Sequence, residues 1–408
     1  MSTILLKHAS IIDIRGKQII ENQHLVIEED RITSITSELP DLDFDQIIDI
    51  DGKFLMPGLC DAHVHVKAIS ANLNNLRFQP LSYVTPVAMQ IMEAMLMRGF
   101  TTVRDAGGAD WGLAKAVEEG YITSPRLIFG GQALSPTGGH GDSRSEGEYT
   151  GPYPQGSSIT RLCDGITEVR KACRDLIRSG ANHIKIMASG GVASPTDRID
   201  SLQFSAEEIQ AVVEEAENAN IYVLAHTYTA EAVNRALELG VRSIEHANLL
   251  DERSITLFSE KNAYLVPTLI TYYALKEEGL ELGLPQSSYE KIDAVLKNGK
   301  QAIRDAYRGG VKMVYGTDLL GEMHRKQLEE FALLSELIDD PWAVLKMATV
   351  NAAELVNMVG DIGEIKQDAY ADLLVYDQNP VQNLDVLLEP ENNLKLIMKA
   401  GTVFKNEL

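Results

Sequence analysis

The segment Leu59-Cys60-Asp61-Ala62-His63-Val64-His65-Val66 combines a short apolar run with two histidines two positions apart. Alternate side chains of a β-strand point to the same face, so His63 and His65 are expected to project together. Imidazole pairs with this spacing are typical of metal sites. The segments that follow along the chain indicate which fold would present such a pair.

Further short runs rich in β-branched residues follow, separated by segments with the amphipathic pattern of helices. Counting the first, the eight runs are 59–66, 101–105, 126–130, 183–187, 222–226, 242–246, 263–266 and 312–318. Eight strands that alternate with helices over roughly 300 residues match a (β/α)8 barrel. We therefore predict an α/β protein built on a distorted (β/α)8 TIM barrel. A doubly wound open sheet is the alternative, and only the strand count argues against it.

The two ends of the chain have a different texture. Residues 1–56 alternate apolar and polar positions in short runs broken by turn residues, and residues 362–408 repeat this pattern. Each piece is too short to fold alone, and chain termini commonly lie close together. We expect one small β-sandwich domain made from 1–56 and 362–408, with the barrel spanning 57–361.

Composition excludes several classes of function. The 408 residues carry 37 basic and 59 acidic side chains, and the net charge of −22 would repel nucleic acids and anionic lipid surfaces. No apolar stretch approaches the roughly 18 residues of a membrane span, and the start lacks a signal-peptide pattern. Cys60, Cys163 and Cys173 are too few for a disulfide framework. We expect a cytoplasmic protein without nucleic-acid or membrane partners.

The irregular segment 131–158 is rich in Gly, Ser, Pro and Asp and contains Thr137-Gly138-Gly139-His140-Gly141-Asp142. A loop of this length inside a compact domain is usually a lid or a binding loop. A flexible insertion without function is the alternative.

Polar side chains recur where later strands are expected to end, which is the face on which such barrels assemble active sites. These further candidate ligands are Lys185, His226, His246 and Asp318. Each interrupts an apolar run, at a depth where an unpaired polar group is costly. Four histidines and a carboxylate suit zinc and exceed what one tetrahedral ion needs. A second ion follows if the Lys185 amine adds carbon dioxide to become a bridging carbamate; a buried ion pair is the alternative for this lysine.

The order His-x-His, Lys, His, His, Asp along these strands resembles the amidohydrolase superfamily, and the likeness covers essentially the whole chain. Longer strings resemble its prolidase and carboxypeptidase branch, which is related to imidazolonepropionases: Thr101-Thr102-Val103-Arg104-Asp105-Ala106-Gly107-Gly108, Thr137-Gly138-Gly139-His140, Ile184-Lys185-Ile186-Met187-Ala188-Ser189-Gly190-Gly191-Val192-Ala193-Ser194-Pro195-Thr196-Asp197, and Gly316-Thr317-Asp318-Leu319-Leu320-Gly321-Glu322. One departure from the superfamily pattern is Asp368, which stands where a turn glycine is usual. Aspartate tolerates the left-handed conformation, so we expect the turn to be kept.

The resemblance implies a centre of two divalent metal ions, with zinc expected. His63, His65 and Asp318 would hold one ion, His226 and His246 the other, and carbamylated Lys185 would bridge both. A metal-bridging hydroxide would attack the amide of a dipeptide, Xaa-Pro in the prolidase-like case, or of an N-acyl amino acid. Asp318 would take the proton and pass it to the leaving nitrogen. A homo-oligomer is expected for this class of barrel.

Four further features are candidates for substrate contact. The Tyr228 hydroxyl and His140 are catalytic candidates for stabilising the oxyanion, with packing and surface roles as their alternatives. His140 could instead bind the substrate carboxylate, as could backbone N–H groups around Gly191 and Val192. Arg104 is the best-placed arginine for that carboxylate, although an ion pair with Asp105 or a neighbouring strand end fits equally well.

Other activities stay open. Another C-terminal residue, arginine, lysine or a hydrophobic one, would make the enzyme a different carboxypeptidase, and a cyclic-amide hydrolase would use the same six ligands. A deaminase or imidazolonepropionase-like hydrolase with one metal is disfavoured, since Lys185 is present and Thr229 stands where deaminases carry a glutamate. A non-catalytic barrel would have lost ligands.

Overall fold

The computed structural model describes residues 3–145, 147–148 and 158–408, and within them both chain ends contribute to one eight-stranded sheet. Its order is β18-β17-β16-β5-β1-β2-β3, with β4 beside β1. The strands are β1 (Thr3–Asp13), β2 (Gln18–Glu28), β3 (Arg31–Thr36), β4 (Gln46–Asp49), β5 (Phe54–Pro57), β16 (Leu373–Tyr376), β17 (Leu394–Lys399) and β18 (Thr402–Asn406).

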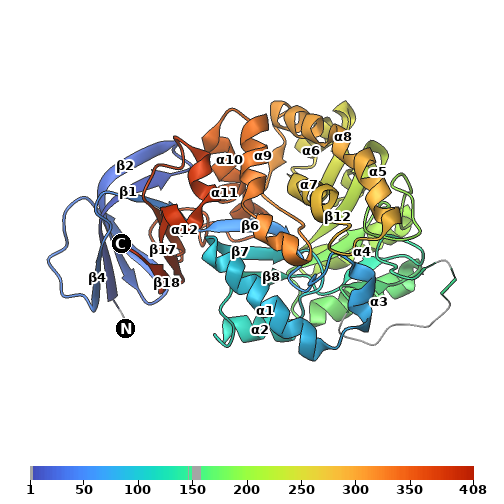
Figure 1. Ribbon diagram of the computed structural model, residues 1–408, viewed down its shortest axis with the longest axis horizontal. Helices are drawn as coiled ribbons and strands as arrows, with labels where there is room; N and C mark the ends of the chain where they lie inside the picture. Colours follow the sequence, from blue (N-terminus) through green and yellow to red (C-terminus); the bar gives the residue numbers. More distant parts are fainter. Residues whose placement is uncertain (1–2, 146, 149–157) are drawn as a thin grey trace.

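The junction between the two ends is the pairing of β5 with β16, in which Leu373 lies opposite Pro57. Figure 1 shows the two termini at the same end of the molecule, beside β4, β17 and β18. A separate apolar cluster joins side chains of both ends, among them Leu25, Leu373 and Leu396. The described strands form a single hydrogen-bonded sheet, so the two packed sheets of the predicted sandwich are not shown. The exact division into domains stays a prediction.

The eight strands predicted for the central region are all present, and they pair in parallel. The sheet β6-β7-β8 contains Leu59–Val64, Phe100–Asp105 and Arg126–Phe129; the sheet β10-β9-β11-β12-β13-β14-β15 contains Thr160–Leu162, Ala133–Ser135, His183–Met187, Tyr222–Thr229, Ser243–Leu249, Tyr264–Val266 and Lys312–Met313. The short strand β9 lies inside the segment predicted as irregular, and residues 146 and 149–157 of that segment lie outside the described residues.

The described strand pairings do not close into a barrel: β15, which is much shorter than predicted, does not pair with β6, and β8 does not pair with the second sheet. β15 ends at Met313, and the chain then leaves the ladder, reaching Asp318 in a left-handed conformation (φ 53°). Single backbone hydrogen bonds span the gap instead: the N–H of Ala62 donates to the Tyr315 carbonyl and that of Asp318 to the His63 carbonyl, each at 2.8 Å. The α/β class with parallel strands is therefore confirmed, and barrel closure is not shown.

Helices connect the parallel strands and pack around them (Figure 1). They are α1 (Leu81–Met97), α2 (Trp111–Glu118), α3 (Gly165–Arg178), α4 (Ala206–Asn218), α5 (Ala230–Glu238), α6 (Glu252–Glu260), α7 (Leu269–Glu278), α8 (Gln286–Arg308), α9 (Glu329–Leu337), α10 (Pro341–Met347), α11 (Val350–Leu355) and α12 (Pro390–Asn393), with short 3₁₀ helices η1 (Leu73–Phe78), η2 (Gly321–Lys326) and η3 (Leu384–Leu388). Side-chain caps at Ser205, Thr229 and Asp251 begin α4, α5 and α6. No described helix has the length and apolarity needed to cross a membrane.

Candidate metal centre

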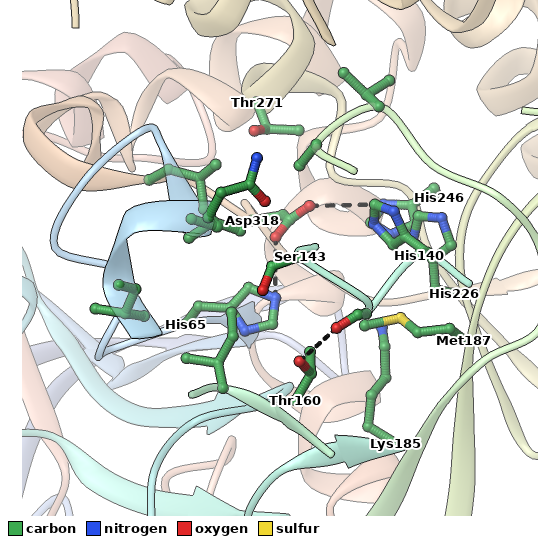
Figure 2. Close-up of a pocket in the computed structure, with 18 of the residues that line it drawn as sticks. His65, His140, Ser143, Thr160, Lys185, Met187, His226, His246, Thr271 and Asp318 are labelled. Atoms are coloured by element: carbon green, nitrogen blue, oxygen red, sulfur yellow. Dashed lines mark hydrogen bonds and ion pairs between the residues drawn. The ribbon is translucent and has the colours of Figure 1, made fainter. Parts of the chain in front are cut away.

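A pocket opens where the parallel strands end, and it gathers the polar residues predicted from the strand ends (Figure 2). All six predicted metal ligands line it: His63, His65, Lys185, His226, His246 and Asp318. They come from β6 and the residue just after it, from β11, β12 and β13, and from the segment after β15. This convergence is the arrangement in which parallel-strand enzymes build active sites.

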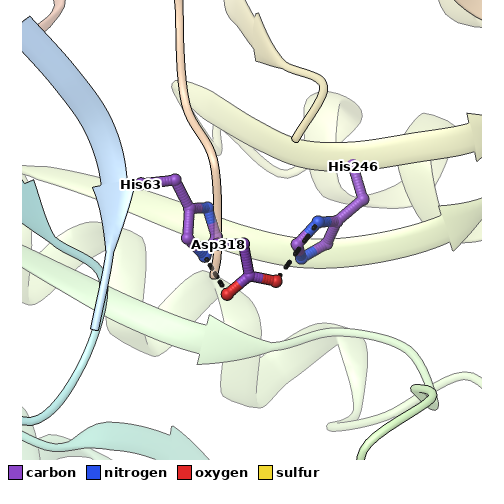
Figure 3. Close-up of side chains that lie close together, drawn as sticks. All are labelled: His63, His246 and Asp318. Carbon is purple, nitrogen blue, oxygen red and sulfur yellow. Dashed lines mark ion pairs between the residues drawn. The ribbon is translucent and has the colours of Figure 1, made fainter. Parts of the chain in front are cut away.

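Asp318 lies at the centre of this group. Its Oδ1 is 3.5 Å from Nε2 of His63 and 3.3 Å from Nε2 of His65, and its Oδ2 is 4.0 Å from Nδ1 of His246. Figure 3 shows the carboxylate between His63 and His246. His63, His246 and Asp318 each have one ligand atom within 4.8 Å of the others. These atoms are close enough to bind a metal ion together.

Each of the four histidines has one ring nitrogen held by a protein partner. The contacts are His63 Nδ1 with Glu245 Oε2 at 2.6 Å, His65 Nδ1 with the Gly107 carbonyl at 2.7 Å, His226 Nε2 with the Gly190 carbonyl at 3.1 Å, and His246 Nδ1 with Thr268 Oγ1 at 2.7 Å. The other ring nitrogen of His63 and that of His65 face the Asp318 carboxylate, at 3.5 and 3.3 Å. Metal-binding histidines are generally oriented in this way, by a hydrogen bond from the second nitrogen.

The backbone around these ligands is strained. His246, Thr268 and Asp318 have positive φ angles of 71°, 51° and 53°, a conformation that costs free energy for residues other than glycine. Such strain is typical of functional sites, where the surrounding fold holds a side chain in a required direction.

Burial keeps most of the imidazole rings neutral. It lowers the pKa of His63 and His226 well below the usual value and that of His246 to about 3. His65 differs: burial opposes its charged form, but the hydrogen bond and charge of Asp318, together with Asp105 and the Gly107 carbonyl, outweigh burial and raise its pKa. Neutral rings offer the lone pairs that a metal ion requires.

The two charged ligands respond to burial in different ways. Burial lowers the pKa of Lys185 to about 8, and no hydrogen-bond or ion-pair partner of its amine occurs among the described residues. Burial acts to raise the pKa of Asp318, but His63 and His65 outweigh it and hold that pKa well below its usual value. The pocket thus combines an ionised carboxylate with a lysine that is readily deprotonated.

Three predicted substrate-contact residues line the pocket beside the ligands. The Tyr272 hydroxyl donates to the Tyr228 hydroxyl at 3.0 Å, which leaves the proton of Tyr228 available to a ligand. The His140 ring stacks on His226, with 4.2 Å between ring centroids, and burial lowers its pKa to about 4. Val192 also lines the pocket.

Two of the predicted substrate contacts, the Arg104 guanidinium and the N–H of Gly191, are wrong. Arg104 is fully buried outside the pocket, and its guanidinium donates to Glu245 at 2.9 Å, the ion pair with a neighbouring strand end that the sequence left open. In the predicted anion-binding nest, the N–H of Gly191 already donates to the Asp197 carboxylate, and that of neighbouring Gly190 donates to the Ser201 carbonyl. Neither group is available to a substrate.

The structure adds residues that the sequence did not single out. Glu245 bonds both His63 and Arg104. In the sequence it stands out as a charged residue inside an apolar strand, immediately before His246. Arg77 of η1 lines the pocket and forms a 2.6 Å ion pair with Glu148. No spacing pattern in the sequence connects η1 with the strand ends.

Comparison with known proteins agrees with this geometry. Residues 54–404 match the family described as "Amidohydrolase family". The chain belongs to the amidohydrolase family. Enzymes of this family are generally metal-dependent, in keeping with the His/Asp cluster, and this amidohydrolase is accordingly an enzyme that acts on C–N amide bonds.

Several relatives of this amidohydrolase are similar over nearly the whole chain. A crystallised prolidase complexed with N-methylphosphonate-L-proline is 44% identical, covers 99% of this chain and 100% of its own, and superposes with a TM-score of 0.97. A Xaa-Pro dipeptidase with bound methionine is 28% identical over 99% of this chain and 100% of its own, with a TM-score of 0.88. An ochratoxinase from Aspergillus niger is 33% identical over 86% of this chain and 75% of its own length. The structural neighbours of the present chain are thus prolidase-like amidohydrolases.

Proposed function

We propose that this amidohydrolase is a prolidase-like dipeptidase that cleaves the amide bond of Xaa-Pro dipeptides at a binuclear metal centre. The observation that carries the proposal is the cluster of four oriented histidines, Asp318 and buried Lys185 in one pocket. The similarity to a prolidase at 44% identity supports the choice of substrate.

The donor set fits two divalent ions, with zinc as the expected metal. We assign His63, His65 and Asp318 to one ion and His226 and His246 to the other. Lys185 would bridge them as a carbamate, for which its amine has the required buried position and lowered pKa. When bound, such ions lower the pKa of a water molecule and polarise the carbonyl of the substrate.

The side chains of the pocket supply the remaining steps. Asp318, ionised and at the centre of the cluster, accepts the proton of the attacking water and transfers it to the leaving nitrogen. That transfer matters for proline, because the nitrogen of its tertiary amide leaves poorly as an anion and departs as a secondary amine once it is protonated. Tyr228 donates its free hydroxyl proton to oxygen of the substrate, and His140 contacts the substrate beside His226.

The lining of the pocket favours proline or another apolar residue at the substrate's C-terminus over arginine or lysine. Apolar side chains that line it include Leu73, Leu76, Tyr272, Leu275 and Leu320. Asp318 is the only acidic residue among its described lining residues, and it is engaged by the histidines. A cationic substrate side chain would therefore find no carboxylate to pair with.

We further propose that the parallel strands form a distorted (β/α)8 barrel at residues 57–361, flanked by a β-sandwich domain made of 1–56 and 362–408. The protein is proposed to act as a cytoplasmic homo-oligomer.

The test is a free-amino-acid release assay over dipeptides that vary at the C-terminal residue, with ochratoxin A and N-acyl amino acids as further substrates. The protein is loaded with zinc in bicarbonate buffer and its metal content is measured. We expect release to be greatest for Xaa-Pro and to fall by at least about 10³-fold in Asp318→Asn. A protein that holds two metal ions and leaves every dipeptide intact would overturn the prolidase assignment.

A further inference from the structure

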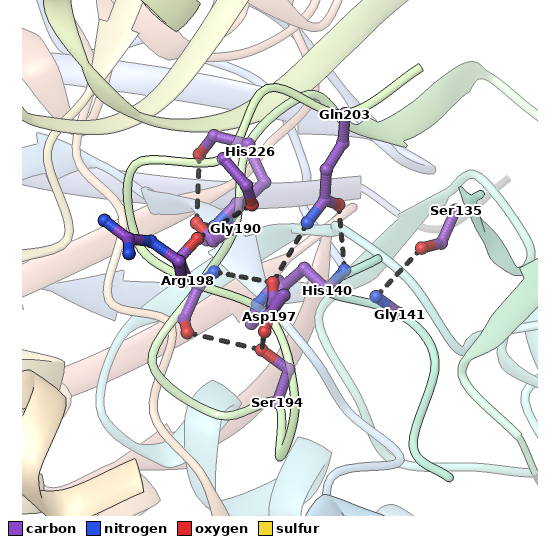
Figure 4. A network of polar contacts seen from close by, with 12 residues as sticks. Ser135, His140, Gly141, Gly190, Ser194, Asp197, Arg198, Gln203 and His226 are labelled. Carbon is purple, nitrogen blue, oxygen red and sulfur yellow. Dashed lines mark hydrogen bonds and ion pairs between the residues drawn. The ribbon is translucent and has the colours of Figure 1, made fainter. Parts of the chain in front are cut away.

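His140 is held from behind by a polar network that the proposed mechanism does not use (Figure 4). Its Nδ1 lies 2.8 Å from Oγ of Ser194, on the loop that follows β11. On the pocket side its ring stacks on His226, at an interplanar angle of 22°. The contact with Ser194 therefore determines which ring nitrogen is left for the substrate.

The other hydrogen bonds of Ser194 show which partner donates in its contact with His140. Besides His140, the Ser194 hydroxyl contacts a carboxylate oxygen of Asp197 and, at 3.2 Å, the carbonyl of Gly191. Both are acceptors only, so the single hydroxyl proton goes to one of them. Oγ must then accept a hydrogen bond from His140, whose Nδ1 carries the proton.

The carboxylate of Asp197 accepts hydrogen bonds from several donors around it. It receives hydrogen bonds from Ser194, from the N–H of Gly191 at 3.0 Å and from Nε2 of Gln203 at 3.0 Å. Gln203 in turn accepts the backbone N–H of His140 at 2.8 Å. The ring and the backbone of His140 are thus both connected to the same carboxylate.

A cation from another element fixes this loop. Nζ of Lys291, on α8, donates to the carbonyls of Gly191, Ser194 and Asp197 at 3.1, 2.9 and 2.7 Å. It also lies 3.5 Å from the Asp197 carboxylate. At Gly191 a Cβ atom would come within 2.1 Å of the His140 ring, so the loop lies directly against the imidazole. The network is a rigid support and not a chance surface contact.

We propose that Ser194 and Asp197 are positioning residues that hold His140 with its proton on Nδ1 and direct Nε2 to the substrate. In the neutral ring Nε2 then carries the lone pair, and it accepts a proton or a hydrogen bond before it can donate one. The effect of this tautomer on catalysis rests on the proposed function. The assignment of the proton to Nδ1 of His140 does not.

The direct test is nitrogen NMR of histidine-labelled protein, with His140 assigned by comparison with His140→Gln. We expect a protonated Nδ1 and an unprotonated Nε2 in the wild type. Asp197→Asn is the sharpest variant, because an asparagine amide can donate to Ser194 and let the hydroxyl donate to Nδ1 instead. It should shift the population towards the Nε2-protonated form. A wild-type ring with its proton on Nε2, or no shift in Asp197→Asn, overturns the proposal.

Kinetics supply a second readout. In Ser194→Ala we expect kcat to fall about 10- to 100-fold with KM changed less than about threefold, the size typical of residues that orient a functional histidine. Ser194→Thr keeps the hydroxyl and should restore most of kcat. Ser201→Ala deletes a hydroxyl of the same loop that, among the described residues, bonds the Arg198 carbonyl alone, and it serves as the matched control. Equal effects of Ser194→Ala and Ser201→Ala would contradict a specific role for Ser194.

The two proposals can fail separately. If the tautomer is as stated and no dipeptide is hydrolysed, the proposed function falls and the positioning of His140 stands. If dipeptides are hydrolysed and the tautomer is the opposite one, the assignment of Ser194 and Asp197 falls alone.

Discussion

Glu245 connects the candidate metal centre to a buried charge. One carboxylate oxygen contacts Nδ1 of His63 at 2.6 Å, and the guanidinium of Arg104 donates to both oxygens at 2.9 Å. Arg104 and Glu245 are fully buried, so neither charge is solvated by water. A single carboxylate therefore orients a predicted metal ligand and neutralises an arginine in the core.

We predict that Glu245→Gln lowers the free energy of unfolding by about 3 kcal/mol, because it leaves the Arg104 charge buried without a counter-ion. Arg104→Met in the same chain should recover much of this loss. Denaturant unfolding of the wild type and the single and double variants measures both changes. The exposed Glu260→Gln is the control, expected within about 0.5 kcal/mol of wild type. Equal losses in the single and double variants would contradict this account of the pair.

Lys185 should react with carbon dioxide in a pH-dependent way. Only the neutral amine forms a carbamate, and burial lowers the Lys185 pKa to about 8, so the carbamate should increase as pH rises through this value. NMR with isotopically labelled bicarbonate at about pH 6 and about pH 9 measures it, with Lys185→Arg as control. A carbamate signal of equal size at both pH values, or one that persists in Lys185→Arg, would contradict the prediction.

Helix α9 carries a buried carboxyl that meets the start of α7. Glu330 accepts the backbone N–H groups of Leu269 and Ile270 at 3.1 and 2.6 Å, and burial raises its pKa to about 8 from the ordinary 4.5. Between these values the folded state keeps a proton that the unfolded state has lost. Stability therefore falls as pH rises through this window.

We predict that Glu330→Gln removes this dependence. The difference in unfolding free energy between wild type and variant should change by at most about 1.4 kcal/mol per pH unit, with the wild type losing stability towards high pH. Denaturant titrations at several pH values between about 5 and about 8 measure the difference. Parallel pH curves for the two proteins would show that Glu330 is not protonated in the folded state.

The sequence predicted those elements best whose side chains follow a simple period. The eight parallel strands were found because burial leaves a local pattern of short apolar runs. The left-handed turn at Asp368 is likewise present, with φ 68°. The departure of the chain from β15 before Asp318 was missed, because it depends on backbone hydrogen bonds to a strand some 250 residues earlier in the chain.

The candidate site shows the same limit. The six ligands were predicted because polar residues are conspicuous in apolar strands, whereas the partner of Arg104 and the occupied N–H of Gly191 depend on side chains brought in from other strands and loops. Ser194 and Asp197 lie on an irregular loop whose spacing carries no period. Such contacts follow from the tertiary fold and not from local sequence.

For the molecule as a whole, metal should couple to stability. Ions that bind only the folded state stabilise it by mass action, by about 4 kcal/mol at a concentration a thousand times the Kd. We predict that chelator treatment lowers the Tm, that zinc restores it, and that Asp318→Asn shows a smaller shift. Calorimetry of the stripped and reloaded proteins tests this. A Tm that is insensitive to chelator, in protein shown to have lost its metal, would contradict it.

The junction of β5 with β16 also constrains how the protein is made. A ribosome completes the first five strands of the large sheet long before it reaches Leu373, and until then the edge of β5 has no partner on that side. An unpaired strand edge is a template for pairing with another chain. The nascent chain must keep this edge protected while some 300 intervening residues are synthesised. Premature termination within the central region would release a product with that edge exposed, and such fragments should aggregate.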